Sequence, residues 1–408
     1  NKLCSVFGLK AIFYYPLDKE HIQNPYPQFR LLTLYKPLYK SIFGFWMVSK
    51  HSYIQRIMKD PRFGQDYSNR MSARYGEDAL DEPYIKMMSQ WLPMINPPNH
   101  TRIRDIVRTS FSPSIVKKMD NDVSEIIDDL LDRIEKKKDF DVIQDYAKPL
   151  PVFVICKILG IPKSDYDWFL NESQLPARLF DPTLMSRKEK EFINKCVVEL
   201  NDYFEKFISL KENEPKEDLG SNMVKAFTDG VWSKGELIST FEVLYAGGHD
   251  TTMNAIANGI YTLHKNPYQL QLLKNNPDLI SSAAQEIFRY ESSFQLASRI
   301  SLENVEFEGV KFKKGDLIVM SLAAANRDPD VFDIPDRFDI KRTPNKHLSF
   351  GAGIHFCIGA MLSKIETELA IKKLYERFPE MKVHDTGSEK WRHMATLRGL
   401  EYLKASTY

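Results

Sequence analysis

Hydrophobic residues recur at intervals of three and four along most of the chain, a spacing that places them on one face of an α-helix. Strand-like segments are short and clustered, and 300–328 is predicted to form hairpins with a turn at its KKGD sequence. The fold class predicted from this pattern is mainly α with a small β-sheet region. The helices are expected at 98–111, 121–137, 188–213 and from 232 onward, and a first strand at 45–49.

The most apolar stretch is PLPVFVICKILGIP at 149–162, and it is interrupted by Lys157. It is too short to span a bilayer, which takes about 20 apolar residues, so we predict a buried helix. The N-terminal residues have no long apolar core beside a cleavage site, and we expect neither a signal peptide nor a membrane anchor. No stretch rich in Gly, Ser or Pro divides the chain, so 1–408 is expected to form one domain.

The long helix that begins near 232 has clear start and stop signals. Ser233 and Glu236 form a capping-box pattern at its start, and Pro267 disfavours helical geometry just before it. The helix would have about thirty residues and be ~45 Å long. Gly247 and Gly248 lie in its middle, where each glycine costs roughly 1 kcal/mol relative to alanine. Either close packing of another helix or a ligand against the backbone would explain them.

Charge and cysteine content exclude several classes of protein. The chain has 56 Lys and Arg against 55 Asp and Glu, so nothing in the net charge indicates a nucleic acid or an anionic membrane as the main partner. Its 4 cysteines are scattered, without the short spacings of a zinc site. Such usage suits a reducing compartment, and a cytoplasmic location is expected.

Two further patterns are weak when taken alone. The sequence LSFGAGIHFCIGA at 348–360 holds Cys357 among glycines that allow positive φ and close approach to a flat or bulky group; a surface turn beside a buried cysteine would look the same. Glu286 and Arg289 lie one helical turn apart and can form an ion pair, as many exposed pairs do. Arg337, in the sequence PDRF, offers a second guanidinium.

Taken together and in order, these motifs resemble those of the cytochrome P450 family, the haem-thiolate monooxygenases. The family's haem-binding signature is matched at Phe350, Gly353, His355, Cys357 and Gly359. Its Glu-x-x-Arg pair is matched at Glu286 and Arg289, with Arg337 in the place of the third member, and its oxygen-activating segment at Gly247, Gly248, His249, Asp250 and Thr251. The segment NPPNHTRIR resembles the one that carries His100 and Arg104 to the cofactor. The resemblance runs from about residue 24, and 1–23 cannot be aligned.

The resemblance implies a triangular helical domain whose long central helix crosses a haem b, Fe-protoporphyrin IX. It implies Cys357 as the metal ligand, with backbone N–H groups aimed at its sulfur, glycines 351, 353 and 359 turning the loop, and a helix from about residue 358 behind it. Asp250 and Thr251 would be the catalytic proton-delivery pair, and Gly247 and Gly248 would make room for dioxygen and the porphyrin. His249 is expected to be a structural or solvent-facing neighbour. The haem propionates would pair with His100, Arg104, Arg299 and His355.

The same resemblance implies an activity and partners. We expect the protein to insert one oxygen atom of O₂ into a hydrophobic molecule of fatty acyl, terpenoid or polyketide type. It would be a soluble bacterial monomer, and its electrons would come from NAD(P)H through a ferredoxin or flavodoxin. Two alternatives are a peroxide-driven peroxygenase and a non-catalytic haem sensor or carrier. The implied substrate pocket includes parts of 67–92 and 175–184, and Val243, Phe294, Leu296, Ala297, Met394 and Leu397. The electron donor would dock on a basic face formed by Arg108, Lys117, Lys118, Lys346 and Lys364.

Overall fold

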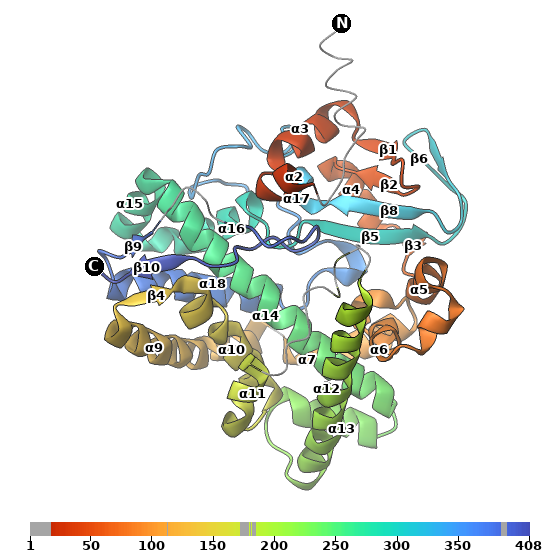
Figure 1. Cartoon of the computed structure of the whole chain (residues 1–408), viewed down its shortest axis with the longest axis horizontal. Coiled ribbons are helices and arrows are strands. Elements are labelled where there is room, and N and C mark those ends of the chain that lie inside the picture. The colour runs from red at the N-terminus through yellow and green to blue at the C-terminus, as the bar shows by residue number, and fades with distance from the viewer. Residues whose placement is uncertain (1–17, 112, 172–178, 180, 182–184, 385–389) are drawn as a thin grey trace, which may run out of the picture.

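The computed structural model describes residues 18–111, 113–171, 179, 181, 185–384 and 390–408. Helices make up most of it; the main sheet lies on one side of the molecule and a small three-stranded sheet on the other (Figure 1). The helices are α2 (Lys19–Gln23), α3 (Tyr26–Tyr35), α4 (His51–Lys59), α5 (Tyr67–Tyr75), α6 (Pro83–Gln90), α7 (Asn99–Ser110), α8 (Pro113–Lys118), α9 (Asp120–Lys137), α10 (Pro149–Leu159), α11 (Tyr166–Asn171), α12 (Arg187–Asn213), α13 (Leu219–Thr228), α14 (Lys234–Lys265), α15 (Pro267–Asn275), α16 (Ile280–Tyr290), α17 (Leu322–Ala325) and α18 (Ala360–Arg377). The strands are β1 (Leu38–Lys40), β2 (Trp46–Val48), β3 (Phe63–Gly64), β4 (Asp139–Asp141), β5 (Leu296–Ser301), β6 (Val305–Phe307), β7 (Val310–Phe312), β8 (Leu317–Ser321), β9 (Lys382–Val383) and β10 (Lys404–Ser406).

The central helix α14 runs obliquely through the molecule and has 32 residues (Figure 1). Both halves of the predicted capping box are present, since Ser233 accepts from the Glu236 N–H and Glu236 accepts from the Ser233 N–H. The helix ends at Lys265, before Pro267, as the sequence predicts. Most of its residues are buried on every side, which is typical of a helix enclosed by others.

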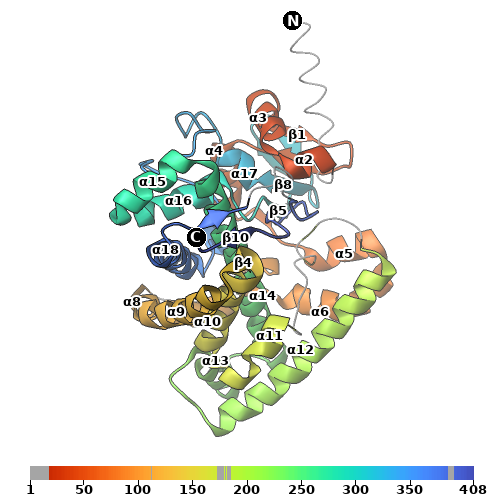
Figure 2. The same ribbon diagram turned by 60° about the vertical axis from the view of Figure 1, so that its left-hand side comes forward.

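Helix α10 confirms the prediction of a buried helix in the most apolar stretch. All of its residues are buried except Lys157, whose ammonium pairs with Asp122 on α9 at 2.6 Å. Gly160 ends the helix with a left-handed φ of 72°, which glycine adopts without steric cost. Figure 2 shows α9 and α10 stacked beside α14, and residues of α9, α10, α12, α14 and α18 contribute to one hydrophobic core.

The main sheet has the strand order β1-β2-β8-β5-β3, in which β2 and β8 are parallel and the other neighbours antiparallel. The predicted strand at 45–49 is present as β2. Its partner β1 was not predicted, because three residues are too few for a periodic signal. In the predicted hairpin region β6 and β7 pair, but β7 and β8, on either side of the KKGD turn, belong to different sheets, so the hairpin predicted at that turn is wrong. Strand β5 begins before 300, and the chain after β8 turns into a helix that the Ser321 hydroxyl caps by accepting from the Ala324 N–H.

No helix within the described part of the chain is both long and apolar enough to cross a membrane. The apolar helix α10 has 11 residues, about half of what a bilayer requires.

Candidate active site

The cysteine loop turns sharply at two glycines before α18. Gly351 and Gly353 have φ of 70° and 71°, in the left-handed region that favours glycine. A Cβ atom on Gly353 would come 2.2 Å from the carbonyl oxygen of Met58 on α4, so this position has no room for a side chain. Gly359 differs from the prediction: its φ is −86°, and it is the N-cap of α18, which begins at Ala360 and not at 358. A Cβ atom there would meet nothing within 4 Å.

The sulfur of Cys357 lies at the end of this loop. The Cys357 N–H donates to the Phe350 carbonyl at 2.9 Å, which closes the loop. The side chain is exposed, and desolvation by the surrounding protein atoms raises the pKa of the thiol. A hydrogen bond from the Gly359 N–H and the positive charge of Arg104 lower the pKa of the thiol in part. The sulfur is thus prepared for a cation that would complete the stabilisation of its ionised form.

Four basic side chains meet beside the loop: His100, Arg104, Arg299 and His355. The His100 and His355 rings lie 4.4 Å apart between centroids. Neither nitrogen of His100, nor Nε2 of His355, has a hydrogen-bond partner among the described residues. Burial, with neighbouring arginines, lowers the pKa of His100 to about 4 and that of His355 to about 3, and burial lowers the pKa of Arg299 to about 10. These ring nitrogens have no acceptor, and the two arginines have no carboxylate partner among the described residues. Such a group of side chains suits an anionic ligand.

The two glycines of α14 have different surroundings. Gly247 is exposed within a mostly buried helix, and a Cβ atom on it would meet nothing within 4 Å. A Cβ atom on Gly248 would lie 3.4 Å from Cγ1 of Ile155, so this residue packs against α10. Open space therefore lies at Gly247, whereas Gly248 is in ordinary van der Waals contact with α10.

The predicted acid and alcohol lie next to Gly247. The Thr251 hydroxyl donates to the Gly247 carbonyl at 2.9 Å. Asp250 is buried, and its carboxylate lies 3.4 Å from Nη1 of Arg392, whose Nη2 donates to Asn254 at 2.6 Å. No sequence motif predicts Arg392 as a site residue, because it lies 142 positions away from Asp250.

His249 has a structural environment. Its Nδ1 lies 2.8 Å from the Tyr245 carbonyl, its ring stacks on Tyr245 with centroids 4.8 Å apart, and its Nε2 is 3.7 Å from Asp250. Because it is buried, the solvent-facing alternative is wrong.

Glu286 and Arg289 form a fully buried, two-pronged ion pair with both N–O distances at 2.8 Å. The second arginine on Glu286 is Arg342, whose Nε lies 3.2 Å from both carboxylate oxygens. The predicted third member, Arg337, is wrong: its side chain is 55% exposed and pairs with Asp339. Arg337 contributes only its carbonyl, which accepts from Arg289 and Arg342, because the turn after it points its side chain outward.

The predicted pocket residues fall into two groups. Val243, Phe294, Ala297 and Met394 are partly exposed, as a wall would be. Leu296 is 5% exposed and packs with Phe29 and Ala323 in a core cluster beneath α3, so it is wrong as a pocket residue. Leu397 is fully buried, opposite Phe294 in an antiparallel bridge, so it is wrong as a pocket residue for the same reason. Most of the predicted wall at 175–184 lies outside the described residues.

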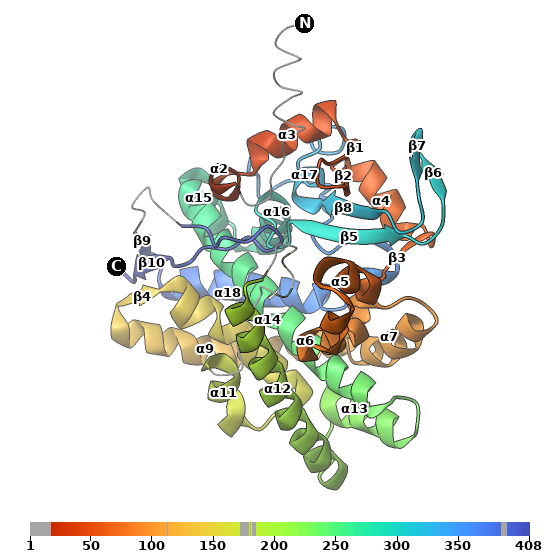
Figure 3. The same cartoon turned by 45° about the vertical axis from the view of Figure 1, so that its right-hand side comes forward.

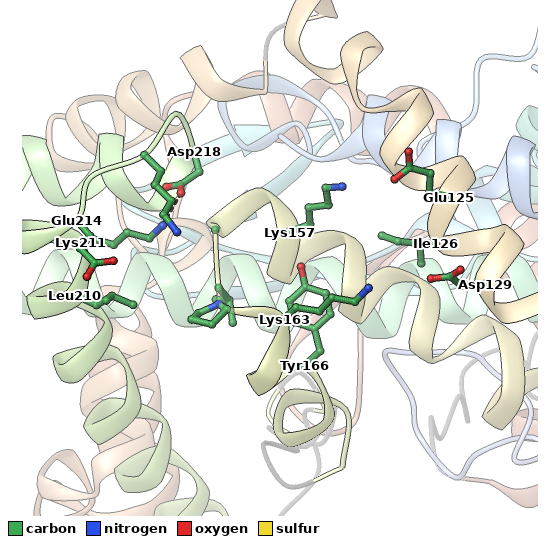
Figure 4. A pocket seen from close by; sticks show the side chains of 14 residues that line it. Glu125, Ile126, Asp129, Lys157, Lys163, Tyr166, Leu210, Lys211, Glu214 and Asp218 are labelled. Carbon is green, nitrogen blue, oxygen red and sulfur yellow. Dashed lines mark hydrogen bonds and ion pairs between the residues drawn. The ribbon is translucent and has the colours of Figure 1, made fainter.

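A separate cleft of about 440 Å³ lies among α9, the turn after α10 and the end of α12 (Figure 4). Opposite charges line it, including the buried pair Lys211 and Asp218. It contains no predicted site residue.

The central site fits the haem that the resemblance implies. Open space next to Gly247 on α14 and next to Gly359 on the cysteine loop suits a flat macrocycle. The accessible sulfur of Cys357 suits its iron, and the unpartnered nitrogens of His100 and His355, with Arg104 and Arg299, suit its two carboxylates.

The comparisons with known proteins agree. The family described as cytochrome P450 matches residues 21–396. The chain is 34% identical to the biotin biosynthesis cytochrome P450 of Bacillus subtilis (95% of this chain, 97% of that one) and 31% identical to the polyketide biosynthesis cytochrome P450 PksS of the same species (98% and 99%). The crystal structure of P450BioI in complex with hexadec-9Z-enoic acid ligated acyl carrier protein superposes with a TM-score of 0.89 at 33% identity, covering 95% of this chain and 99% of that one. With the geometry of the cysteine loop, these matches show that the chain belongs to the cytochrome P450 family, whose members are haem-binding monooxygenases.

Proposed function

We propose that this protein inserts one oxygen atom of O₂ into a hydrophobic molecule with an apolar chain, using electrons delivered by a separate protein. The observation that carries the proposal is the Thr251 hydroxyl bonded to the exposed Gly247 of a buried helix, with a buried acid, Asp250, next to it in the sequence. A peroxide-driven enzyme does not need this acid and alcohol, because hydrogen peroxide already carries the protons that have to be added to reduced O₂. The names of the relatives, which concern polyketides and an acyl chain, support an extended apolar substrate.

Haem, when bound, supplies the activation of dioxygen and the transfer of its oxygen atom. Cys357 would hold the iron through its sulfur, while the Gly359 N–H withdraws some of the charge of the sulfur. The four basic residues beside the loop would hold the carboxylates. With charged partners available, His100 and His355 would gain protons that burial otherwise disfavours.

Proton supply falls to the side chains of α14. The Thr251 hydroxyl, now donating to the Gly247 carbonyl, can hold a proton at the open side of the helix. Asp250 is the nearest acid in sequence, and its partner Arg392 is partly exposed, so the pair connects the buried carboxylate with the outside. Such positioned proton donors typically contribute 10²–10⁴-fold to a rate.

Thr251→Ala is expected to keep haem and substrate binding but to divert most electrons from product to hydrogen peroxide, because only the positioned proton is lost. Product formed per NADH consumed should fall about tenfold or more. Thr252→Ala is the matched control, since the Thr252 hydroxyl bonds Ser363 on α18 at 3.1 Å. Thr251→Ser should restore most of the coupling. Undiminished coupling in Thr251→Ala would show that Thr251 has no part in proton supply.

The electron donor is proposed to dock on the basic face beside the cysteine loop. Lys117 and Lys346 are exposed, and neither forms an ion pair with a described carboxylate. Arg108 is paired weakly with Asp105 at 3.6 Å, and Lys364 with Glu368 at 3.6 Å. The side chain of Lys118 lies outside the described residues. These groups would steer an acidic ferredoxin or flavodoxin.

Lys117→Glu/Lys346→Glu should therefore lower the second-order rate of reduction by an acidic ferredoxin about tenfold at low ionic strength. The difference should shrink as salt shortens the Debye length from ~10 Å at 0.1 M to ~3 Å at 1 M. Lys188→Glu/Lys311→Glu, with exposed lysines on α12 and β7, makes the same change in net charge elsewhere. Equal rates in the two double variants would place the docking surface elsewhere.

A further inference from the structure

An arginine that forms no ion pair with any described carboxylate lies where α5 meets the main sheet. Arg70 is on α5, and its Nη1 donates to the Ser298 hydroxyl of β5 at 3.3 Å. Figure 3 shows α5 beside the end of β5 and above α6. Ser298 stands between Ala297, a predicted wall of the substrate pocket, and Arg299, one of the predicted cofactor residues. Side chains alternate along a strand, so the Ser298 hydroxyl lies on the opposite face of β5 from the side chains of Ala297 and Arg299. It is the place of α5 within the implied pocket segment 67–92 that puts the guanidinium at the edge of the implied pocket.

The charge of Arg70 is not compensated by the described residues. A guanidinium has five N–H donors, and Arg70 uses one, at a long distance. The nearest acid in sequence, Asp66, accepts from the Asn69 amide at 2.9 Å and forms no ion pair with Arg70. Burial lowers the pKa of Arg70, and repulsion from Arg74 adds to this, while Tyr67 and Asp66 act in the opposite direction. A guanidinium that is partly removed from water and has no ion-pair partner favours an anion beside it.

The neighbouring polar groups are also incompletely bonded. Gln65 is 7% exposed; its Nε2 reaches the Ser298 carbonyl at 3.4 Å, and its Oε1 has no partner among the described residues. Further out, Arg74 and Lys190 lie over the Tyr75 ring at 5.0 Å and 4.0 Å from its centroid. Positive charge thus extends from the start of α12 along α5 to β5.

We propose that Arg70 binds the carboxylate of the substrate, so that the protein acts on an acid with an apolar chain whose other end reaches the haem. This inference rests on the proposed function and adds the chemistry of the substrate's head group. A guanidinium matches a carboxylate through two parallel N–H···O bonds, and the partial burial of Arg70 strengthens them. Arg74 and Lys190 attract the same anion toward the inner site.

Dodecanoic acid and dodecan-1-ol serve as probes, because they differ only in the head group. Binding is measured by calorimetric titration and by the shift of the Soret band in the haem-loaded protein. The parent should bind the acid more tightly than the alcohol. Arg70→Gln should weaken binding of the acid about ten- to a hundredfold, as expected for loss of a charged hydrogen bond, and leave the alcohol unchanged. Arg70→Lys should recover part of the loss.

Arg74→Gln is the matched control, since it removes the same charge one helical turn away and should change the affinity for the acid severalfold at most. Equal weakening of both probes in Arg70→Gln, or an equal loss in Arg74→Gln, would overturn the proposal. A fall in haem content in Arg70→Gln would also overturn it, because Arg70 would then serve the haem carboxylates. Calorimetry measures binding without turnover. A protein that binds the acid more tightly than the alcohol but makes no oxygenated product would therefore refute the proposed function and leave the role of Arg70 supported.

Discussion

Arg342→Ala is expected to destabilise the protein severely, whereas Arg337→Ala is expected to leave it nearly unchanged. Arg342 contacts both oxygens of the buried Glu286 carboxylate, and its own side chain is 9% exposed. Removing one member of a buried ion pair typically costs about 3–5 kcal/mol, a large part of a total stability of about 5–15 kcal/mol. Arg337 is an exposed partner of Asp339, and such a pair contributes at most about 1 kcal/mol.

Glu286→Gln should show the largest loss in this group. Glu286 accepts from Arg289, Arg342, the Asn345 amide and the Asp339 N–H, so neutralising it leaves two buried guanidiniums without a counter-charge. The measurements are urea unfolding followed by circular dichroism and the haem content of purified protein. If Arg337→Ala and Arg342→Ala have similar free energies of unfolding, whether both are high or both are low, Arg342 is not the third member of the group formed with Glu286 and Arg289.

Cys357→Ser is expected to abolish the red-shifted Soret band of the ferrous carbonyl complex that thiolate ligation gives this family. The serine hydroxyl is a far weaker donor to iron than a thiolate, and product formation should fall to background. Absorbance spectra of the reduced, carbon monoxide-treated protein provide the test.

Cys196→Ser is the matched control, because Cys196 is a buried thiol on α12 with no part in the site. Its spectrum should equal that of the parent. A red-shifted band that persists in Cys357→Ser would mean that another residue holds the iron.

Local signals in the sequence predicted the features that depend on neighbouring residues. The capping box at Ser233 and the stop at Pro267 fixed α14 within a residue, since both act within one helical turn. The apolar run of α10 and the glycine turn at Gly353 were predictable for the same reason.

Features that depend on tertiary contacts were not predictable in this way. Arg337 and Arg342 are both arginines near the same turn, and only the path of the chain decides which one reaches Glu286. The different surroundings of Gly247 and Gly248 depend on where Ile155 of α10 lies. The contacts of Arg392 and Arg70 cross 142 and 228 positions of sequence, a separation at which a single chain's pattern carries no signal.

The ion pair between Arg392 and Asp250 has a consequence for engineering. Arg392 and Met394 belong to the same short C-terminal segment, where the Met394 N–H donates to the Arg392 carbonyl at 2.8 Å. Exchanging this segment for that of a relative, in order to alter the predicted substrate wall at Met394, would also replace the counter-ion of Asp250 on the distant helix α14. A chimera built to change selectivity must therefore keep arginine at 392, or a loss of coupling will be mistaken for a poor fit of the new substrate.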